Sequence, residues 1–576
     1  MDMSERSEKI REESLWFGET EHPLFGRVTV PAGGTSRGGV LISPPIGRES
    51  RLARRALRTL AIYLANDGYV SLRFDHFGTG DSGGSMDDNE LDRVWVEGID
   101  QGVELLRSFG IDSISAIGMR MGAAILGTAA LKYDLGLSSL VLWDPCESGR
   151  AYARELVALG ALRQDTFVSE LDEATQMLEY ALSESAAIRL NEFNLMEPAA
   201  RSVAERVLVV VRDDRALSSR FRARWSEDEV EWTSTSEQGP LLEAQLPNSI
   251  QPELTIAEIR SWLTSPEVIE ASLSLPPFPQ DVIVTKGSNS FSVRETVVDL
   301  GFRKMFGIIS EPVGAPQGPL IVMVNGVNED HVGPARLWVE LSRRWASLGL
   351  RCLRFDSSEL GESPWTPDQV TRFVWNKSRY QDIGDAVRAL SPADPGDSVL
   401  VGYCSGAGLA LEVASGLRTR GVCAINPELG AGVFRSFSRM RKSNREAVRS
   451  VVNQVEGQLT RYPWLDKLIR RGTHLMVTSL YPPKISPTLI KNRSETLLVL
   501  SPEDLSPLRQ IPMFGWIFRL RLVPSEYLHI EIVPGLDHAI LSTLGSSRAV
   551  SILDRHVVTK FVASQASETN QFPGAT

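Results

Sequence analysis

Residues Ser398–Ala410 read SVLVGYCSGAGLA, and they carry the strongest indication of the fold that we expect. A short apolar run, Val399–Val401, leads into the turn Gly402–Gly406, and small residues able to start a helix follow it. The pattern G-x-C-x-G therefore predicts a strand, a sharp turn and a helix, with the side chain of Cys404 exposed at the turn. Glycine is needed two residues to either side, because a Cβ atom there would collide with the neighbouring strand or helix.

This turn resembles the nucleophile elbow of the α/β-hydrolase family, in which the central residue attacks a carbonyl carbon. The sequence GYCSGA is most similar to the cysteine variants of that family, such as dienelactone hydrolases and polyhydroxyalkanoate synthases. The resemblance implies an α/β fold, with a mostly parallel sheet flanked by helices and a helical cap inserted before the catalytic acid. Taken by itself, Cys404 could also be a buried structural cysteine in a glycine-rich turn.

Length and composition limit the class of protein. The chain has 576 residues, which is too long for one hydrophobic core and predicts several domains. It carries 61 basic and 72 acidic residues, a formal charge of −11, which argues against a nucleic-acid partner. Its four cysteines are irregularly spaced and indicate neither a disulfide framework nor a zinc site, and no cofactor is implied.

The sequence also bears on where the protein is located. No run of about 18 apolar residues is present, so we expect no membrane span. The N-terminal stretch MDMSERSEKIREES is charged and lacks the apolar segment of a secretory signal. We therefore expect a cytoplasmic protein.

The order of predicted elements occurs twice along the chain. A strand at 69–74 leads into the polar loop Asp75–Gly83, and a strand at 351–355 leads into the similar loop Asp356–Ser363. These two loops begin 281 positions apart, and Arg120 lies 284 positions before Cys404, at the corresponding turn. Such a near-constant spacing indicates an internal repeat.

Strands that alternate with helices in both repeats predict parallel sheets with right-handed crossovers. We therefore predict two tandem α/β-hydrolase-like domains at residues 1–264 and 281–563. A linker rich in serine and proline joins them at 265–280, and a disordered tail follows at 564–576.

The second half contains the residues of a catalytic triad in the order that the family resemblance implies. A strand at 496–500 precedes Glu503 and Asp504, and a strand at 529–533 precedes His538. The resemblance implies that Cys404 is the nucleophile and His538 the base. Asp504 would orient the imidazole and stabilise its protonated form, and Glu503 is the alternative acid.

The resemblance also implies an oxyanion hole beside Cys404. The backbone N–H groups of Ser405 and Val327 would donate to the negatively charged oxygen of the reacting carbonyl group. In this chain Asn325-Gly326 precedes Val327 where the family usually has His-Gly.

A cysteine nucleophile changes the reaction that we expect. An acyl-cysteine is a thioester, which water, an amine, an alcohol or a thiol can intercept. We therefore predict an acyltransferase or thioesterase that acts on a thioester or ester substrate. One alternative is a carboxylesterase or dienelactone-type hydrolase, and another is a catalytically inactive binding or scaffold protein.

The first half lacks a complete catalytic set. Arg120 occupies its elbow, and a guanidinium group that stays protonated cannot attack a carbonyl. Asp214 follows the strand at 207–211 as a possible acid, whereas Gln238 stands in the position of the base. These substitutions predict a pseudo-hydrolase domain that serves as a scaffold or recruits substrate.

The two segments expected to form caps differ in charge. Residues 431–490 contain eleven Lys or Arg and three Asp or Glu, whereas residues 151–200 contain three Arg and nine Asp or Glu. Both segments could be solvated surfaces. Alternatively, the basic cap receives an anionic carrier such as coenzyme A or an acyl carrier protein, or the two caps dock on each other within the chain.

Overall fold

The computed structural model describes most of both halves of the chain. The described residues are 10–167, 183–197, 202–225, 230–243, 250–264, 271–286, 291–326, 329–364, 377–427, 489–502, 526–537, 540 and 543–562. Val327, Glu503, Asp504, His538 and the predicted tail lie outside them, as does the predicted basic cap except for residues 489 and 490.

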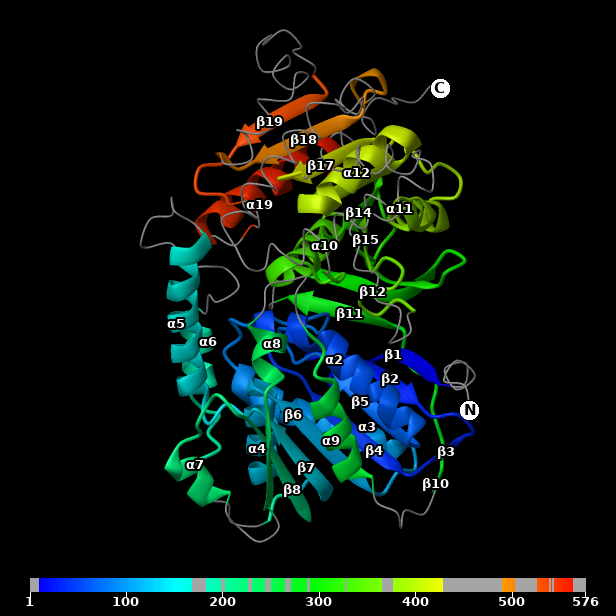
Figure 1. The fold of residues 1–576 in the computed structure, drawn as a ribbon. Helices are drawn as coiled ribbons and strands as arrows, with labels where there is room; N and C mark the ends of the chain where they lie inside the picture. The colour runs from blue at the N-terminus through cyan, green and yellow to red at the C-terminus, as the bar shows by residue number, and fades with distance from the viewer. Residues whose placement is uncertain are drawn as a thin grey trace, which may run out of the picture.

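The first half is built on an eight-stranded sheet (Figure 1). Its strands, in spatial order, are β1 (Arg11–Phe17), β2 (Leu24–Val30), β5 (Tyr69–Phe74), β4 (Gly38–Ser43), β6 (Ile114–Met119), β7 (Leu137–Trp143), β8 (Arg206–Arg212) and β9 (Val230–Thr235). The β1–β2 and β2–β5 pairs are antiparallel, and all the others are parallel. A short pair, β3 (Thr35–Ser36) with β10 (Ala271–Ser272), lies beside the sheet.

The second half is built on a nine-stranded sheet. Its strands, in spatial order, are β11 (Asp281–Lys286), β12 (Phe291–Leu300), β13 (Met305–Pro312), β15 (Arg351–Phe355), β14 (Leu320–Val324), β16 (Ser398–Tyr403), β17 (Gly421–Ile425), β18 (Glu495–Leu500) and β19 (Leu528–Ile532). The β11–β12, β12–β13 and β13–β15 pairs are antiparallel, and the remaining pairs are parallel. The predicted fold class is confirmed, because the chain has two sheet-containing α/β domains.

The two sheets correspond strand by strand. The order β1-β2-β5-β4-β6-β7-β8-β9 in the first half matches β12-β13-β15-β14-β16-β17-β18-β19 in the second, with β11 added at the edge. In each half, the third parallel strand counted along the chain leads into the predicted elbow turn: β6 leads to Arg120, and β16 leads to Cys404.

Helices cover both faces of each sheet. In the first half α2 (Gly47–Asn66), α8 (Gln238–Leu242) and α9 (Glu253–Leu263) share one apolar core, while α3 (Leu91–Ser108) and α4 (Met121–Lys132) share the other. The described residues of this half form three more helices: α5 (Gly149–Phe167), α6 (Glu184–Leu190) and α7 (Ser219–Arg224).

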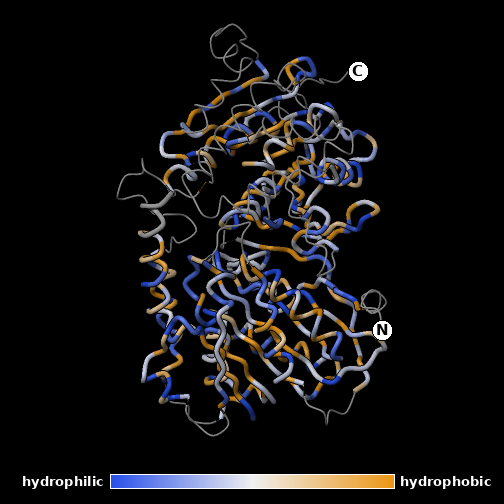
Figure 2. The backbone as a smooth tube through the Cα atoms, in the orientation of Figure 1, coloured by the Kyte–Doolittle hydropathy of each residue, from blue (hydrophilic) through white to orange (hydrophobic). Residues whose placement is uncertain are grey.

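The second half has the same three layers. Among its described residues, the helices are η2 (Pro334–Arg336), α10 (Leu337–Ser347), α11 (Lys377–Leu390), α12 (Cys404–Leu417), α19 (Thr543–Val557) and the π-helical turn η3 (Val558–Val562). Along β16, Val399 and Val401 face α10 and α19, whereas Leu400 faces α11 and α12. This alternation is that of a strand buried on both faces, and apolar stretches follow the strands of both halves in Figure 2.

The two halves meet along β1 and β11 (Figure 1). Trp16 and Phe25 of the first half form one buried apolar cluster with Phe306 and Ile308 of the second, and the rings of Phe25 and Phe306 lie 6.1 Å apart. The chain between the halves also contacts the first half, because Leu273 N–H donates to Gly34 O over 2.9 Å. Within the described residues, every helix is too short or too polar to cross a membrane.

Candidate active site

Cys404 lies at the turn between β16 and α12, in a conformation that L-residues rarely adopt. Its φ angle is +51°, and its side chain is half-buried, while Tyr403 before it is extended and buried. Arg120 at the turn between β6 and α4 has φ of +55°. Such left-handed residues at a strand-to-helix turn cost free energy and are usually held in place for function.

The glycines of the motif allow the turn to pass close to its neighbours. A Cβ atom on Gly402 would lie 2.7 Å from Gly406 O, and one on Gly406 would lie 2.5 Å from Asn325 O. In the first half, a Cβ atom on Gly122 would lie 2.2 Å from Pro44 O. The structure thus gives the physical reason for glycine that the sequence pattern implied, at both elbows.

The loop after β14 packs directly against the Cys404 turn. Gly326 lies beside the Tyr403 ring, and Asn325 Nδ2 donates to Phe355 O over 2.8 Å. The predicted oxyanion residue Val327 follows this anchored pair but lies outside the described residues. Ser405, the second predicted oxyanion residue, is buried in the first turn of α12, where backbone N–H groups form the positive end of the helix.

A buried asparagine, Asn426, ties together the two segments from which the predicted base and acid extend. Asn426 follows β17, the strand that pairs with β16, and it has φ of +44° and no exposed surface. Its Nδ2 donates to Asp537 O over 2.8 Å, and its Oδ1 accepts from Ser501 N–H over 2.7 Å. Asp537 directly precedes His538, and Ser501 lies three residues before Asp504, so both loops start at the edge of the sheet that carries Cys404.

Asn426 is a site residue that was not predicted from the sequence. The available signal was a polar residue placed directly after the buried strand Gly421–Ile425, at the carboxyl edge next to the elbow strand. Asp504 and His538 themselves lie outside the described residues, so their distances to Cys404 stay a prediction.

The other cysteines are buried in the core of the protein. Cys352 and Cys423 have no exposed surface, and Cys146 is 5% exposed. Burial raises the pKa of all three thiols far above the ordinary value, so the neutral thiol dominates near neutral pH. Cys404 is thus the cysteine with an accessible side chain.

In the first half the elbow arginine is locked into a buried ion network. Arg120 Nε donates to Glu49 Oε1 over 2.9 Å, and its Nη2 donates to Glu155 Oε1 over 2.8 Å. Asp144 lies 3.5 Å from Nη1. Burial raises the pKa of Asp144 to about 6, against the opposing effect of Arg120. A guanidinium held by three carboxylates has a structural role at this position.

The other two predicted residues of the degenerate site do not join this network. Asp214 is exposed, and its carboxylate pairs with Arg212, whose Nη2 lies 2.7 Å from Oδ2. Gln238 begins α8 and is fully buried, and neither polar atom of its amide group has a hydrogen-bond partner among the described residues. Among the described residues, the carboxylates that pair with Arg120 are those of Glu49, Glu155 and Asp144.

The two polar loops that revealed the repeat, Asp75–Gly83 and Asp356–Ser363, face each other across the boundary between the halves; we call them the motif loops. Arg73, just before the first loop, makes two 3.0 Å hydrogen bonds with Glu362 of the second. Arg354, just before the second loop, bonds Asp81 of the first. Arg73 and Arg354 are 281 positions apart, and so are Asp81 and Glu362. Each half therefore contributes an arginine and a carboxylate from equivalent positions, and each arginine pairs with the carboxylate of the other half.

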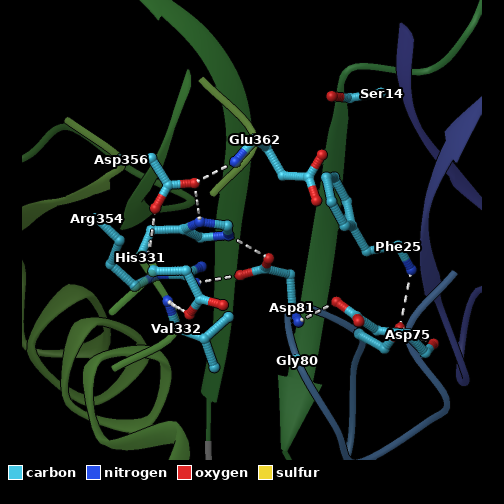
Figure 3. Close-up of polar contacts among 12 residues, drawn as sticks. Ser14, Phe25, Asp75, Gly80, Asp81, His331, Val332, Arg354, Asp356 and Glu362 are labelled. Carbon is cyan, nitrogen blue, oxygen red and sulfur yellow. Dashed lines mark hydrogen bonds and ion pairs between the residues drawn. The ribbon is translucent and has the colours of Figure 1, made fainter. Parts of the chain in front are cut away.

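His331 sits between the two halves within this network (Figure 3). Its Nε2 lies 2.6 Å from Asp81 Oδ2 and its Nδ1 lies 2.8 Å from Asp356 Oδ2. Burial lowers the pKa of His331, but Asp356 and Asp81 outweigh that effect and hold the pKa well above its ordinary value. A protonated imidazole therefore bridges the first half to the loop after β14, which begins beside Cys404.

Comparison with models of known families gives a match within the second half of the chain. Residues 321–550 match the model of the alpha/beta hydrolase family. The matched range contains Cys404, Asp504 and His538, and it covers the second half of the chain only.

Solved structures of several hydrolases resemble about half of the chain. A dienelactone hydrolase from Anabaena variabilis has 12% identity and a TM-score of 0.30, over 47% of this chain and 99% of that one. An esterase from Pyrococcus furiosus has 14% identity and a TM-score of 0.29, over 48% of this chain and 94% of that one. A proline iminopeptidase from Mycobacterium smegmatis has 15% identity and a TM-score of 0.29, over 44% and 97%. A search of curated proteins found no match.

Proposed function

We propose that the second half is a hydrolase or acyltransferase that works through an acyl thioester of Cys404. The observation that carries the proposal is the geometry at Cys404: a half-buried thiol with φ of +51° at the start of a 14-residue helix. Two glycines, at which a Cβ atom would lie within 2.7 Å of backbone oxygens, allow this turn to form. The match of residues 321–550 to the alpha/beta hydrolase family supports the same reading.

The proposed reaction has two steps. In the first, His538 takes the thiol proton, the sulfur attacks the carbonyl carbon, and the leaving alcohol or thiol departs with that proton. The N–H groups of Ser405 and Val327 donate to the negatively charged oxygen of the tetrahedral intermediate. In the second step, water or another nucleophile gives a proton to His538 and attacks the thioester carbon. The carbon–sulfur bond then breaks, and the sulfur of Cys404 takes the proton from His538, which restores both residues.

The positions of the described neighbours are consistent with these roles. Asn426 holds the residue before His538 and the start of the loop that bears Asp504. Hydrogen bonds of this kind fix the orientation of reacting groups, whose positions must be correct to within about half an ångström. We further propose that the acyl group arrives on coenzyme A or an acyl carrier protein, recognised by the basic segment 431–490.

We propose that the first half does no chemistry of its own and derives from the same α/β-hydrolase unit as the second. The corresponding strand orders and the two left-handed elbow residues support a common origin. The ion pairs of Arg120 support a non-catalytic role, because they fill the elbow with a buried cation.

Intact-protein mass spectrometry after brief mixing with acetyl-, hexanoyl- and decanoyl-coenzyme A tests the proposal. We expect the wild-type protein to gain the mass of one acyl group, and Cys404→Ala to gain none. Cys146→Ala, which changes a buried cysteine of the first half, is the matched control and should still be acylated. If Cys404→Ala is acylated as well as the wild type, or if no thioester or ester yields an adduct or a product, the proposal is wrong.

A further inference from the structure

The loop between β14 and α10 begins beside Cys404 and ends on the first half of the chain. In the first half, residues 44–46 are enough to connect the equivalent strand and helix, β4 and α2. In the second half, residues 325–336 make this connection, and the predicted oxyanion residue Val327 belongs to it. Extended connections between a strand and the next helix are unusual in compact domains, and functional residues are concentrated in them.

The β14–α10 loop starts against the turn that bears the nucleophile. A Cβ atom on Gly406, in the first turn of α12, would lie 2.5 Å from both Val324 O and Asn325 O. The start of the loop is therefore fixed to the same turn as Cys404. This is the loop in which the family resemblance places one donor of the oxyanion hole.

Three successive residues that follow Val327 each pair with a side chain of the first half. The pairs are Glu329 with Arg51 over 2.7 Å, Asp330 with Arg54 over 2.8 Å, and His331 with Asp81 over 2.6 Å (Figure 3 shows the last). At most 17% of any of these side chains is exposed. Pairs that are this well shielded from water and salt hold a loop more firmly than pairs at the surface.

The end of the β14–α10 loop has a strained backbone. Ala335 and Arg336 have φ of +45° and +67°, in the left-handed region that costs free energy for residues other than glycine. The guanidinium of Arg336 donates to three backbone oxygens of the first half: Gly80 O over 2.8 Å, Ser82 O over 2.5 Å and Gly84 O over 2.9 Å. A strained conformation persists only where surrounding contacts hold it, and these three contacts come from the first half.

We propose that the first half positions the β14–α10 loop beside Cys404, so that Cys404 is acylated at full rate only while the pairs between the halves are formed. The inference rests on the proposed function of Cys404. Arg51 and Arg54 act through Glu329 and Asp330 and are positioning residues. The first half thus contributes to catalysis in the second half, although Arg120 fills its own elbow.

Two reactions of Cys404 separate this role from a general role in folding. In acetylation by p-nitrophenyl acetate, the sulfur bonds the carbonyl carbon, the oxyanion accepts from the loop, and p-nitrophenol leaves with the thiol proton. In alkylation by iodoacetamide, the sulfur displaces iodide from a saturated carbon, and no oxyanion forms. A displaced loop should therefore slow acetylation and leave alkylation unchanged.

The pair of Arg51 with Glu329 allows a charge-reversal test. Arg51→Glu should slow acetylation of Cys404 about tenfold, which is part of the roughly 100- to 1,000-fold effect of losing one oxyanion donor. Glu329→Arg should have a similar effect, and the double variant should recover most of the rate, because the pair is restored with its charges exchanged. Arg55→Met, one turn further along α2, is the control: the charge of Arg55 interacts with Glu253 of the first half, so both reactions should be unchanged.

Release of p-nitrophenol and the mass of one acetyl group measure acetylation, and circular dichroism shows whether each variant is folded. Arg51→Met, which removes the charge without adding repulsion, takes the place of Arg51→Glu if that variant is unfolded. Acetylation of the folded Arg51 variant as fast as the wild type would overturn the inference and leave the proposed function intact. Alkylation that slows together with acetylation, or no recovery in the double variant, would also overturn it. If no ester or thioester acylates the wild type, the proposed function fails and the inference fails with it.

Discussion

Replacing Glu362 with glutamine removes one negative charge from the middle of the boundary between the halves. The Glu362 side chain has no exposed surface. It accepts two 3.0 Å hydrogen bonds from Arg73, and Arg27 lies 3.3 Å away. Arg54 and Arg58 approach within 3.8 and 3.9 Å. Glutamine keeps the shape of the side chain but leaves these guanidinium groups with less compensating charge.

The magnitude follows from burial. Removing one partner of a buried ion pair costs about 3–5 kcal/mol, because the remaining charge cannot return to water. Glu12, Asp75 and Asp330 still compensate part of the arginine charge. We therefore expect Glu362→Gln to lower the free energy of unfolding by about 3 kcal/mol, at the lower end of that range.

The effect depends on pH in a defined direction. Burial would raise the pKa of Glu362, but Arg73 and Arg27 outweigh it and hold the pKa well below the ordinary value of 4.5. The ionised carboxylate therefore contributes its full stabilisation above pH 4.5, and this contribution is lost as the pH falls from there towards the pKa of the folded protein. The difference between wild type and Glu362→Gln should be constant from pH 6 to 8 and should shrink below about pH 4.5.

Equilibrium urea unfolding followed by tryptophan fluorescence measures this difference. Asp385→Asn is the matched control, because Asp385 pairs with Arg388 on an exposed face of α11. An exposed pair contributes about 0–1 kcal/mol, so the control should unfold almost as the wild type does. A loss below about 1 kcal/mol for Glu362→Gln would contradict this expectation, since the buried ion pairs of Glu362 would then contribute no more than a surface pair.

Three further predictions concern the second half. Asn426→Ala should slow acylation of Cys404 at least tenfold, which corresponds to about 1.4 kcal/mol. Asn492→Ala, which alters a more exposed amide, is the control and should not slow acylation. Equal acylation rates in the two variants would contradict the role of Asn426 in holding the loops. Gly402→Ala should destabilise the protein by about 1–3 kcal/mol in urea unfolding, because the new Cβ atom meets backbone atoms. Gly416→Ala, in an open part of α12, should stabilise the protein by about 0.5–1 kcal/mol. The reverse order of stabilities would contradict the packing at Gly402. The loss of stability in His331→Gln should be largest below pH 6.5 and should diminish as the pH rises through the raised pKa of His331, and a loss that grows with pH would show that the imidazole is neutral.

The sequence predicted the parallel part of both sheets, because its signals are local. An apolar run such as Val399–Val401 is the pattern of a strand that is buried on both faces. The glycines around Cys404 are required by contacts with atoms that lie within a few residues in the sequence or after the adjacent strand. The antiparallel strands β1, β2 and β11–β13 were not predicted. Strand β1, for example, has a half-buried pattern whose meaning depends on its partner β2 and on the other half of the chain.

The boundary between the halves could not be derived from the sequence for a similar reason. Arg73 and Arg354 read as ordinary strand residues, and their burial depends on carboxylates about 280 positions away in the opposite motif loop. The turn at Cys404, in contrast, could be predicted because Cys404, its glycines and the helix α12 are contiguous in the sequence. The predicted acid and base, Asp504 and His538, stay predictions, since the described residues end just before each of them.

Peptide-mapped alkylation by iodoacetamide tests whether His538 activates Cys404, because the thiolate, and not the thiol, is the nucleophile that reacts. We predict that Cys404 is alkylated at pH 7 much faster than a cysteine of the urea-unfolded chain, and that His538→Gln removes this advantage. Cys352 and Cys423, which are fully buried, should stay unmodified in the folded protein. Alkylation of Cys404 no faster than in the unfolded chain, or unchanged in His538→Gln, would contradict a nucleophilic Cys404 activated by His538.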